Sequence, residues 1–100
     1  MFYYNIIQTM QKYLVEFLGT FFFLYVILAS GGEALAIGAA LAFAIFLGGK
    51  ISGGHFNPAV TTMMAMAKKM SPADFLPYIV AQLAGGFAAL EVYKRYKFKF

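Results

Sequence analysis

Asn57, Pro58 and Ala59 are the residues of this sequence whose types and order best suit a chemical task. An asparagine directly before a proline is typical of a helix start, because its side-chain oxygen accepts a backbone N–H of the first turn and proline at the first position gives up no needed donor. We expect this hydrogen bond to come from a residue near Val60, which leaves the Asn57 amide N–H groups free to point outward. The motif therefore predicts a small hydrogen-bonding site at the start of a helix.

The helix after this motif is expected to be short. Residues 58–67 are largely apolar and are followed by Lys68 and Lys69. At about 1.5 Å per residue they cover roughly 15 Å, which is half of a hydrocarbon layer. Such a length favours a re-entrant loop and half-helix within 50–68 over a full span. The unpaired N–H groups at its start carry roughly half a positive charge, which disfavours cations and protons near the middle of a membrane.

A glycine-rich stretch leads into the motif. Gly53 and Gly54 permit a backbone that is not helical, and irregular backbone survives at membrane depth only where it lines a wet path or is buried in protein. We therefore expect the carbonyl oxygens of Gly53, Gly54 and His55 to accept hydrogen bonds from water or a hydroxylated solute. The ring of His55 is expected to pack near the loop, because a single histidine in a chain without cysteine argues against a metal site.

The composition of the chain indicates the environment of these residues. Of its 100 residues, 62% are apolar and 12% are charged, which is more apolar surface than a domain of this size buries in a core of its own. The apolar residues form long blocks, so lipid is the expected solvent and partner. The Lys and Arg residues flank these blocks instead of forming one face, which argues against a nucleic-acid partner. We expect neither a cofactor nor an enzymatic activity.

Three apolar blocks have roughly the length of a membrane span: residues 13–30, 34–49 and 72–92. The second block is short and rich in Gly and Ala, which lets neighbouring helices approach closely. The third begins with Ser71, Pro72 and Asp74, a helix start in which the serine caps and the aspartate faces the positive end of the dipole. The expected fold is an all-α membrane protein, one domain over 1–100, with three transmembrane helices and one re-entrant half-helix.

The segment SGGHFNPAVT at 52–61 resembles the first re-entrant loop of the aquaporin and glycerol-facilitator family, the major intrinsic proteins. Three further stretches agree with this family in order and spacing: EFLGTF at 16–21, LAIGAALA at 35–42 and YIVAQLAGG at 78–86. The resemblance covers about residues 12–93 and implies half of an inverted repeat in an integral, multi-pass membrane protein. It also implies a passive channel for water or for small uncharged solutes such as glycerol.

The sequence departs from the family pattern in its number of halves. Family members usually carry two halves in inverted orientation, and an arginine that narrows the outer mouth follows their second Asn-Pro-Ala. In these 100 residues the motif occurs once, and the residue after Ala59 is Val60. A complete pore is therefore expected to need a second half.

Glu16 is an ionisable residue inside the first expected span, where an unpaired carboxylate is costly, and it is therefore a functional-site hypothesis. The resemblance implies that Glu16 is a buried acceptor for backbone N–H groups of the re-entrant loop, assisted by Gln82. A proton relay through Glu16, as in a small multidrug-type transporter, is the alternative. A non-conducting membrane subunit, or the remnant of a truncated gene, is a third hypothesis.

The resemblance also implies where a pore would be narrowest. In the family, one residue of the second span and three of the opposite half build the constriction, and the second-span position corresponds here to Ile37. If two copies combine, Ile45, Gly54 and Val60 of the second copy complete the ring. This ring is apolar and has no arginine, so we expect it to admit glycerol as well as water.

The distribution of basic residues bears on the assembly. Three spans place the two ends of the chain on opposite sides of the membrane, and the basic residues then divide evenly between the sides. One set is Lys12, Lys50, Lys68 and Lys69, and the other is Lys94, Arg95, Lys97 and Lys99. Orientation follows an imbalance of Lys and Arg, so without one both orientations are accessible. We expect an antiparallel homodimer, able to group into larger oligomers, in which Gly38, Gly85 and Gly86 suit close helix contact.

Overall fold

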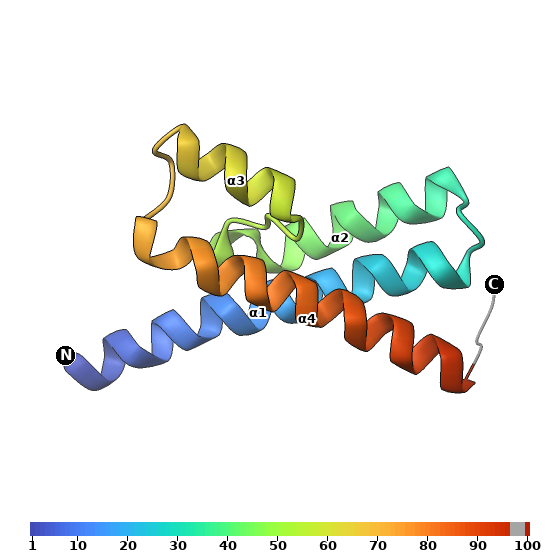
Figure 1. Cartoon of the computed structure of the whole chain (residues 1–100), viewed down its shortest axis with the longest axis horizontal. Helices are drawn as coiled ribbons and strands as arrows, with labels where there is room; N and C mark the ends of the chain where they lie inside the picture. The colour runs from blue at the N-terminus through green and yellow to red at the C-terminus, as the bar shows by residue number, and fades with distance from the viewer. Residues whose placement is uncertain (97–99) are drawn as a thin grey trace.

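The structure is a computed structural model of the chain and describes residues 1–96 and 100. The described residues form four helices and no strand (Figure 1). In chain order the helices are α1 (Phe2–Ala29), α2 (Ala34–Ser52), α3 (Pro58–Met66) and α4 (Pro72–Tyr96). Helices α1, α2 and α4 are long and apolar enough to cross a bilayer. The prediction of an all-α membrane protein is therefore confirmed.

Helices α1 and α2 are longer than the predicted spans. α1 begins at Phe2, well before the predicted start, because residues 2–12 contain no glycine or proline that would end a helix. α2 continues beyond its predicted end to Ser52 and stops where Gly53 takes a left-handed φ of 92°. Hydropathy marks the hydrocarbon layer, whereas a helix continues until a residue breaks it.

Helix α4 also runs beyond its predicted end. It reaches Tyr96, because Lys94 and Arg95 are good helix formers and their charge suits the negative end of the helix dipole. Lys97 and Lys99, which are expected on the same side of the membrane as Lys94 and Arg95, lie outside the described residues. The basic residues thus extend the helix past the hydrocarbon instead of ending it.

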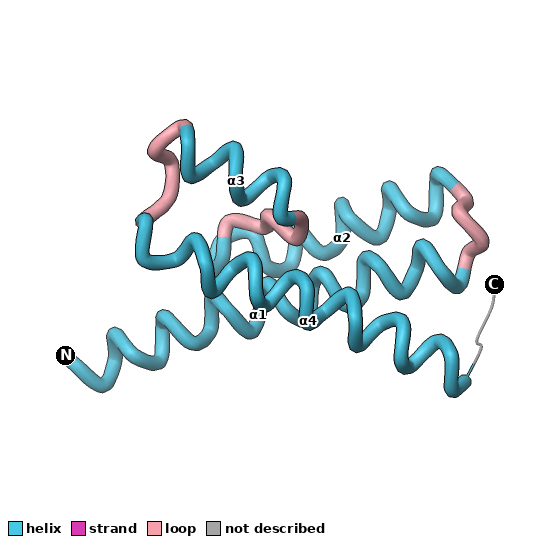
Figure 2. Tube along the Cα trace, in the orientation of Figure 1, coloured by secondary structure: helices cyan, strands magenta, loops and turns pink. Residues whose placement is uncertain are grey.

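Helix α3 has the length of a half-helix. Its 9 residues rise roughly 14 Å at about 1.5 Å per residue. Its C-terminal end lies at the same end of the molecule as the N-terminus of α1 and the start of α4 (Figure 1). The turn between α1 and α2 and the last turns of α4 lie at the opposite end. Figure 2 shows the irregular segment between α2 and α3 lying in the interior of the bundle, between these two ends. The chain therefore runs the length of the molecule three times.

Helix α1 is central, since it packs against both α2 and α4. Gly85 of α4 permits a close approach, because a Cβ built there would lie 2.6 Å from the Phe17 carbonyl oxygen of α1. Gly86 of α4 lies beside Leu24 of α1, since a Cβ built at Gly86 would lie 3.0 Å from the leucine Cδ1. The expectation that Gly85 serves contact between copies is wrong, because this glycine is buried inside the chain. A Cβ at Gly38 would meet nothing within 4 Å.

Candidate functional site

Glu16 lies at the centre of a buried hydrogen-bond network. Its Oε2 accepts hydrogen bonds from Ser52 Oγ at 2.8 Å and from the His55 N–H at 3.1 Å. Its Oε1 accepts from the Phe56 N–H and from Gln82 Nε2, both at 2.8 Å. The side chain is 0% exposed. Four donors therefore face this carboxylate, which offsets the cost of burying it.

This network joins the three long helices to the loop. Glu16 belongs to α1, Ser52 ends α2 and Gln82 belongs to α4, while the loop supplies two backbone N–H groups. The structure thus brings Glu16 and Gln82 together and adds Ser52, which sequence reasoning misses. Ser52 opens the segment that resembles the family, but a serine there gives no signal of its carboxylate partner on another helix.

Thr61, Tyr78 and the ring of His55 extend the network. Gln82 Nε2 also donates to Thr61 Oγ1 at 2.8 Å, and Thr61 Oγ1 lies 2.8 Å from His55 Nδ1. The Tyr78 hydroxyl donates to the Ser52 carbonyl oxygen at 2.6 Å, and its ring centroid lies 5.2 Å from that of His55. All of these side chains are buried. Sequence reasoning misses Thr61 and Tyr78, because their partners lie on other elements.

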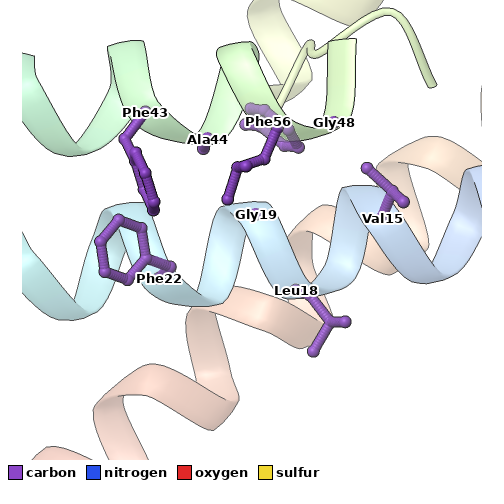
Figure 3. A pocket seen from close by; sticks show the side chains of 9 residues that line it. Val15, Leu18, Gly19, Phe22, Phe43, Ala44, Gly48 and Phe56 are labelled. Atoms are coloured by element: carbon purple, nitrogen blue, oxygen red, sulfur yellow. The ribbon is translucent and has the colours of Figure 1, made fainter. Parts of the chain in front are cut away.

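Phe56 has the backbone conformation that turns the loop into α3. Its φ of 54° lies in the left-handed region, which is uncommon for a bulky residue, and the residue is 1% exposed. Its ring points from the loop toward Gly19 of α1 (Figure 3), where a Cβ would overlap it and lie 2.6 Å from Cδ1. At Gly48 of α2 a Cβ would lie 3.5 Å from Cζ. That is an ordinary van der Waals distance, whereas the same Cβ would lie 2.6 Å from Val15 Cγ1. Sequence reasoning assigns no role to Phe56 or to Gly19, which makes room for its ring.

Asn57 caps α3 and is exposed. Its Oδ1 accepts the Ala59 N–H at 2.7 Å, one residue earlier than expected, because a short asparagine side chain reaches the N–H two residues on. Pro58 occupies the first helical position. Among the described residues, neither Asn57 Nδ2 nor the Val60 N–H has an acceptor. The start of α3 therefore presents free donors together with the positive end of its dipole.

The loop before Asn57 is irregular backbone with free acceptors. Gly53 and Gly54 have φ values of 92° and 65°. Within the described part of the chain, no hydrogen bond reaches the carbonyl oxygens of Gly53, Gly54 or His55. Gly54 lies against α2, since a Cβ built there would lie 3.4 Å from Ile45 Cγ1. Free acceptors and the free donors at Asn57 thus follow one another along the loop.

The residues expected at a constriction lie on two helices. Ile37 and Ile45 belong to α2, about two turns apart, and Val60 belongs to α3. Ile45 is 43% exposed, whereas Ile37 and Val60 are half-buried. The structure therefore places Ile45 beside the loop, at Gly54, and Ile37 nearer the start of α2.

An ion pair joins α1 and α4 at the end of the molecule where α4 begins. Lys12 Nζ lies 2.7 Å from Asp74 Oδ2, and the Tyr13 hydroxyl donates to Asp74 Oδ1 at 2.8 Å. Ser71 Oγ accepts the Ala73 N–H at 3.3 Å, so the predicted serine cap of α4 is present. Sequence reasoning relates Asp74 to the helix dipole alone and misses its contact with α1.

The chain is similar to known proteins over most of its length. A sequence model of the family described as "Major intrinsic protein" matches residues 30–98. "Glycerol uptake facilitator protein-like 6" of Lactiplantibacillus plantarum is 43% identical over 95 residues, which cover 87% of this chain and 44% of that protein. "Aquaporin Z" of Brucella melitensis is 38% identical over 97 residues, which cover 83% of this chain and 42% of that protein. The chain therefore spans less than half the length of these relatives, and no solved structure matches it significantly.

Proposed function

Because the chain belongs to the major intrinsic protein family, we propose that it forms one half of a passive transmembrane channel for water and small uncharged solutes such as glycerol. The names of its relatives include a glycerol uptake facilitator and an aquaporin. The observation that carries the proposal is the succession of free acceptors and free donors along the loop, which ends at the exposed start of α3. Such a role is transport and involves no catalytic step.

A permeating molecule would exchange hydrogen bonds along this path. Water or a polyol would donate to the carbonyl oxygens of Gly53, Gly54 and His55, and would accept from Asn57 Nδ2. Each such bond replaces one made in bulk water, so the cost of leaving water stays small. The positive end of the α3 dipole raises the energy of a cation at the same place. Neutral hydroxylated solutes would therefore pass while cations are held back.

The expected constriction favours a channel that is not restricted to water. Ile37 of one half would face Ile45, Gly54 and Val60 of the other half. No residue of this set carries a charge or a side-chain donor, so the ring would select by width more than by hydrogen bonding. We expect glycerol flux as well as water flux. A preparation that conducts water and rejects glycerol completely would contradict this part of the proposal.

The second half is proposed to be another copy inserted in the opposite sense. The start of α1 and the end of α4 lie at opposite ends of the molecule (Figure 1), and basic residues occur near both ends, among them Lys12 and Lys94. This distribution gives the insertion machinery little basis for one orientation. A closed two-fold dimer would bring two Asn57 ends together and reproduce an inverted repeat.

The site gives no support to the proton-coupled transporter. A coupling carboxylate exchanges its proton with solvent or with the substrate, whereas Glu16 is 0% exposed. Its two oxygens already accept four hydrogen bonds, two of them from the loop backbone. Glu16 is therefore better assigned to holding the loop, as the family resemblance implies.

Stopped-flow light scattering on the purified chain, reconstituted alone in lipid vesicles, tests the function. Water and glycerol shocks should both be relieved faster than in empty vesicles, and an uncoupler should change neither rate. Flux that depends on adding a second polypeptide would replace the homodimer by a heteromer. Folded, inserted protein without flux in either preparation would contradict the channel and favour the non-conducting subunit.

A topology reporter fused after Phe100 tests the antiparallel arrangement. In cells, equal insertion in both senses should give a signal from each side of the membrane. A signal from one side only, in a preparation that conducts without any other protein, would contradict the antiparallel homodimer.

A further inference from the structure

An apolar groove of about 370 Å³ lies between α1 and α2. Its lining includes the buried residues Ala44 and Phe56, and the exposed side chains of Leu18 and Leu47. Figure 3 shows the side chains that line the groove between the two helices. Both helices are long and apolar enough to span a membrane, so this groove offers its surface to hydrocarbon and not to water.

A polar pocket of about 460 Å³ lies between the same two helices, at the end of the molecule where α1 begins and α2 ends. All but one of its lining residues can donate a hydrogen bond from the side chain. These donors are Asn5, Gln8, Thr9, Gln11, Lys12 and Lys50. The polar pocket and the apolar groove thus follow one another along one pair of helices.

The polar pocket and the apolar groove share one face of each helix. On α1, Val15 of the groove follows Lys12 of the pocket by three residues, and on α2 Leu47 precedes Lys50 by three. Residues three apart on a helix share a face and lie roughly 4.5 Å apart along its axis. The headgroup region on each side of a bilayer is about 5–8 Å thick. One lipid molecule can therefore reach both places, with its headgroup in the pocket and a chain in the groove.

The length of α2 places the polar pocket at a membrane surface. The helix has 19 residues, which rise roughly 28 Å and so match a hydrocarbon layer of about 30 Å. Glu33 caps one end of α2, and Lys50 lies in the last turn at the other end. A lysine at this depth holds its ammonium group among the headgroups while its carbon chain stays in the hydrocarbon.

The charges around the polar pocket favour an anion. Among the described residues, the Lys50 side chain has neither an ion pair nor a hydrogen-bond partner. Lys12 donates to Asp74, and its ammonium group keeps two further N–H donors. The dipoles of α1 and α2 oppose one another here, because α1 begins and α2 ends at this place, so the lysines decide the sign of the potential.

The same charges disfavour a headgroup that is zwitterionic. Among the described side chains, no carboxylate is free at the pocket to pair with an ammonium group of the lipid. Asp74 is paired with Lys12, and Glu16 accepts four hydrogen bonds inside the bundle. Glu33 and Glu91 lie at the opposite end of the molecule (Figure 1). A headgroup with a net negative charge therefore suits the pocket best.

We propose that α1 and α2 together bind one anionic phospholipid, with its phosphate at Lys12 and Lys50 and one acyl chain in the apolar groove. Basic pockets between membrane helices bind anionic headgroups in this way. The side-chain amides of Gln8 and Gln11 offer further donors to the phosphate. The binding needs only the folded chain in a membrane, so it is independent of the proposed channel function.

Quenching of tryptophan fluorescence by brominated lipid tests the proposal. The chain contains no tryptophan, so Leu47→Trp places a single reporter on the wall of the groove. Phe46→Trp is the matched control, because Phe46 is 82% exposed and lines neither the groove nor the pocket. Both variants are placed in phosphatidylcholine vesicles with rising fractions of phosphatidylglycerol that carries bromine on its acyl chains. Half-maximal quenching at position 47 should need about fivefold less brominated lipid than at position 46, the preference that one lysine near a lipid surface supplies.

Charge variants in the Leu47→Trp background test the headgroup contact. Lys50→Gln should abolish the fivefold preference. Lys69→Gln should keep it, because Lys69 is exposed at the same end of the molecule and lines neither the groove nor the pocket (Figure 1). A loss in both variants would show a general effect of surface charge and overturn the proposal. Phosphatidylcholine brominated on the same chains should show no preference for position 47, and a preference equal to that of phosphatidylglycerol would overturn the proposal as well.

Two further results would overturn the proposal. Equal quenching curves at positions 46 and 47 would show that the groove holds only the surrounding bulk lipid. Quenching at position 46 without any at position 47 would show that a second copy of the chain covers the groove. A free phosphate ion carries no bromine, so the quenching reports the lipid alone. If Leu47→Trp does not insert, Leu18→Trp repeats the measurement from the α1 side of the groove, where Leu18 is 50% exposed.

Discussion

The two sides of the loop use their polar groups in opposite ways. On the inner side, the N–H groups of His55 and Phe56 both end on the buried carboxylate of Glu16. One residue later, Asn57 Nδ2 has no acceptor among the described residues and belongs to an exposed side chain. Free donors keep their direction only on a rigid support, because a loose loop would turn them toward any nearby acceptor. The buried network around Glu16 is therefore the rigid support that keeps the Asn57 donors available to a permeating molecule.

Removing the support is expected to have the largest effect. Glu16→Ala leaves the N–H groups of His55 and Phe56 buried without an acceptor, and each such group costs about 1–3 kcal/mol. The folded fraction in gel filtration should fall sharply, and water flux should be lost. Glu91→Ala is the matched control, because Glu91 is exposed and its ion pairs contribute at most about 1 kcal/mol. Equal folded fractions of the two variants would show that the loop does not depend on the Glu16 carboxylate.

Filling the hollow under Phe56 is the next strongest change. Gly19→Ala places a methyl group where the Phe56 ring lies, and overpacking of this kind costs about 1–3 kcal/mol. Gly38→Ala is the control, because its methyl group meets nothing within 4 Å and should stabilise the helix by up to about 1 kcal/mol. Thermal unfolding measures both.

A second substitution tests whether Phe56 transmits the damage. Phe56→Leu shortens the side chain, so the double variant with Gly19→Ala should recover part of the lost melting temperature and flux. Additive losses in the double variant would show that the two sites act independently.

Changing the exposed side is expected to affect conduction much more than stability. Asn57→Asp keeps an oxygen to cap α3 but replaces the amide donors by a negative charge, so proton or cation leak should rise with little change in melting temperature. Asn57→Ala also loses the cap, at about 1 kcal/mol. Flux of water and of protons is measured at equal protein density. Normal water flux with intact proton exclusion in both variants would place the conduction path elsewhere.

The smallest effect is expected at the ion pair between Lys12 of α1 and Asp74 of α4, at the end of the molecule where α4 begins. Lys12→Met should lower stability by about 1 kcal/mol, because it leaves a mostly buried aspartate with Tyr13 as its remaining partner. Lys94→Met, at an exposed pair with Glu91, should change it by less than about 0.5 kcal/mol. Melting curves at low salt compare the two variants. The reverse order would show that the ion pair does not fix α1 against α4.

The elements of this fold follow from local features of the sequence. Pro58 after a glycine-rich stretch predicts where α3 begins, and the lysines at Lys68 and Lys69 predict where it stops. The true ends of α1 and α4 do not follow from hydropathy, because a helix extends through polar residues until glycine, proline or the end of favourable propensity stops it.

The packing of the site depends on contacts that no local pattern displays. The sequence pairs Glu16 with Gln82 only through a family resemblance, and it leaves Ser52 and Thr61 without partners. The fit of Phe56 against Gly19 joins a loop to a distant helix, and the left-handed φ of Phe56 runs against the preference of its residue type. Such a conformation arises because the Glu16 carboxylate fixes the N–H groups of His55 and of Phe56 itself.

The hydrogen bond between Glu16 and Gln82 joins residues that lie 66 positions apart. During synthesis, α1, α2 and α3 all leave the ribosome before Gln82 does. Until then Glu16 Oε1 and Thr61 Oγ1 each lack the donor that Gln82 Nε2 supplies, and contacts over such separations form late. Helix α4 therefore completes this network only after α1, α2 and α3 have been synthesised, and we expect a nascent chain stalled before Pro72 to lack both hydrogen bonds from Gln82.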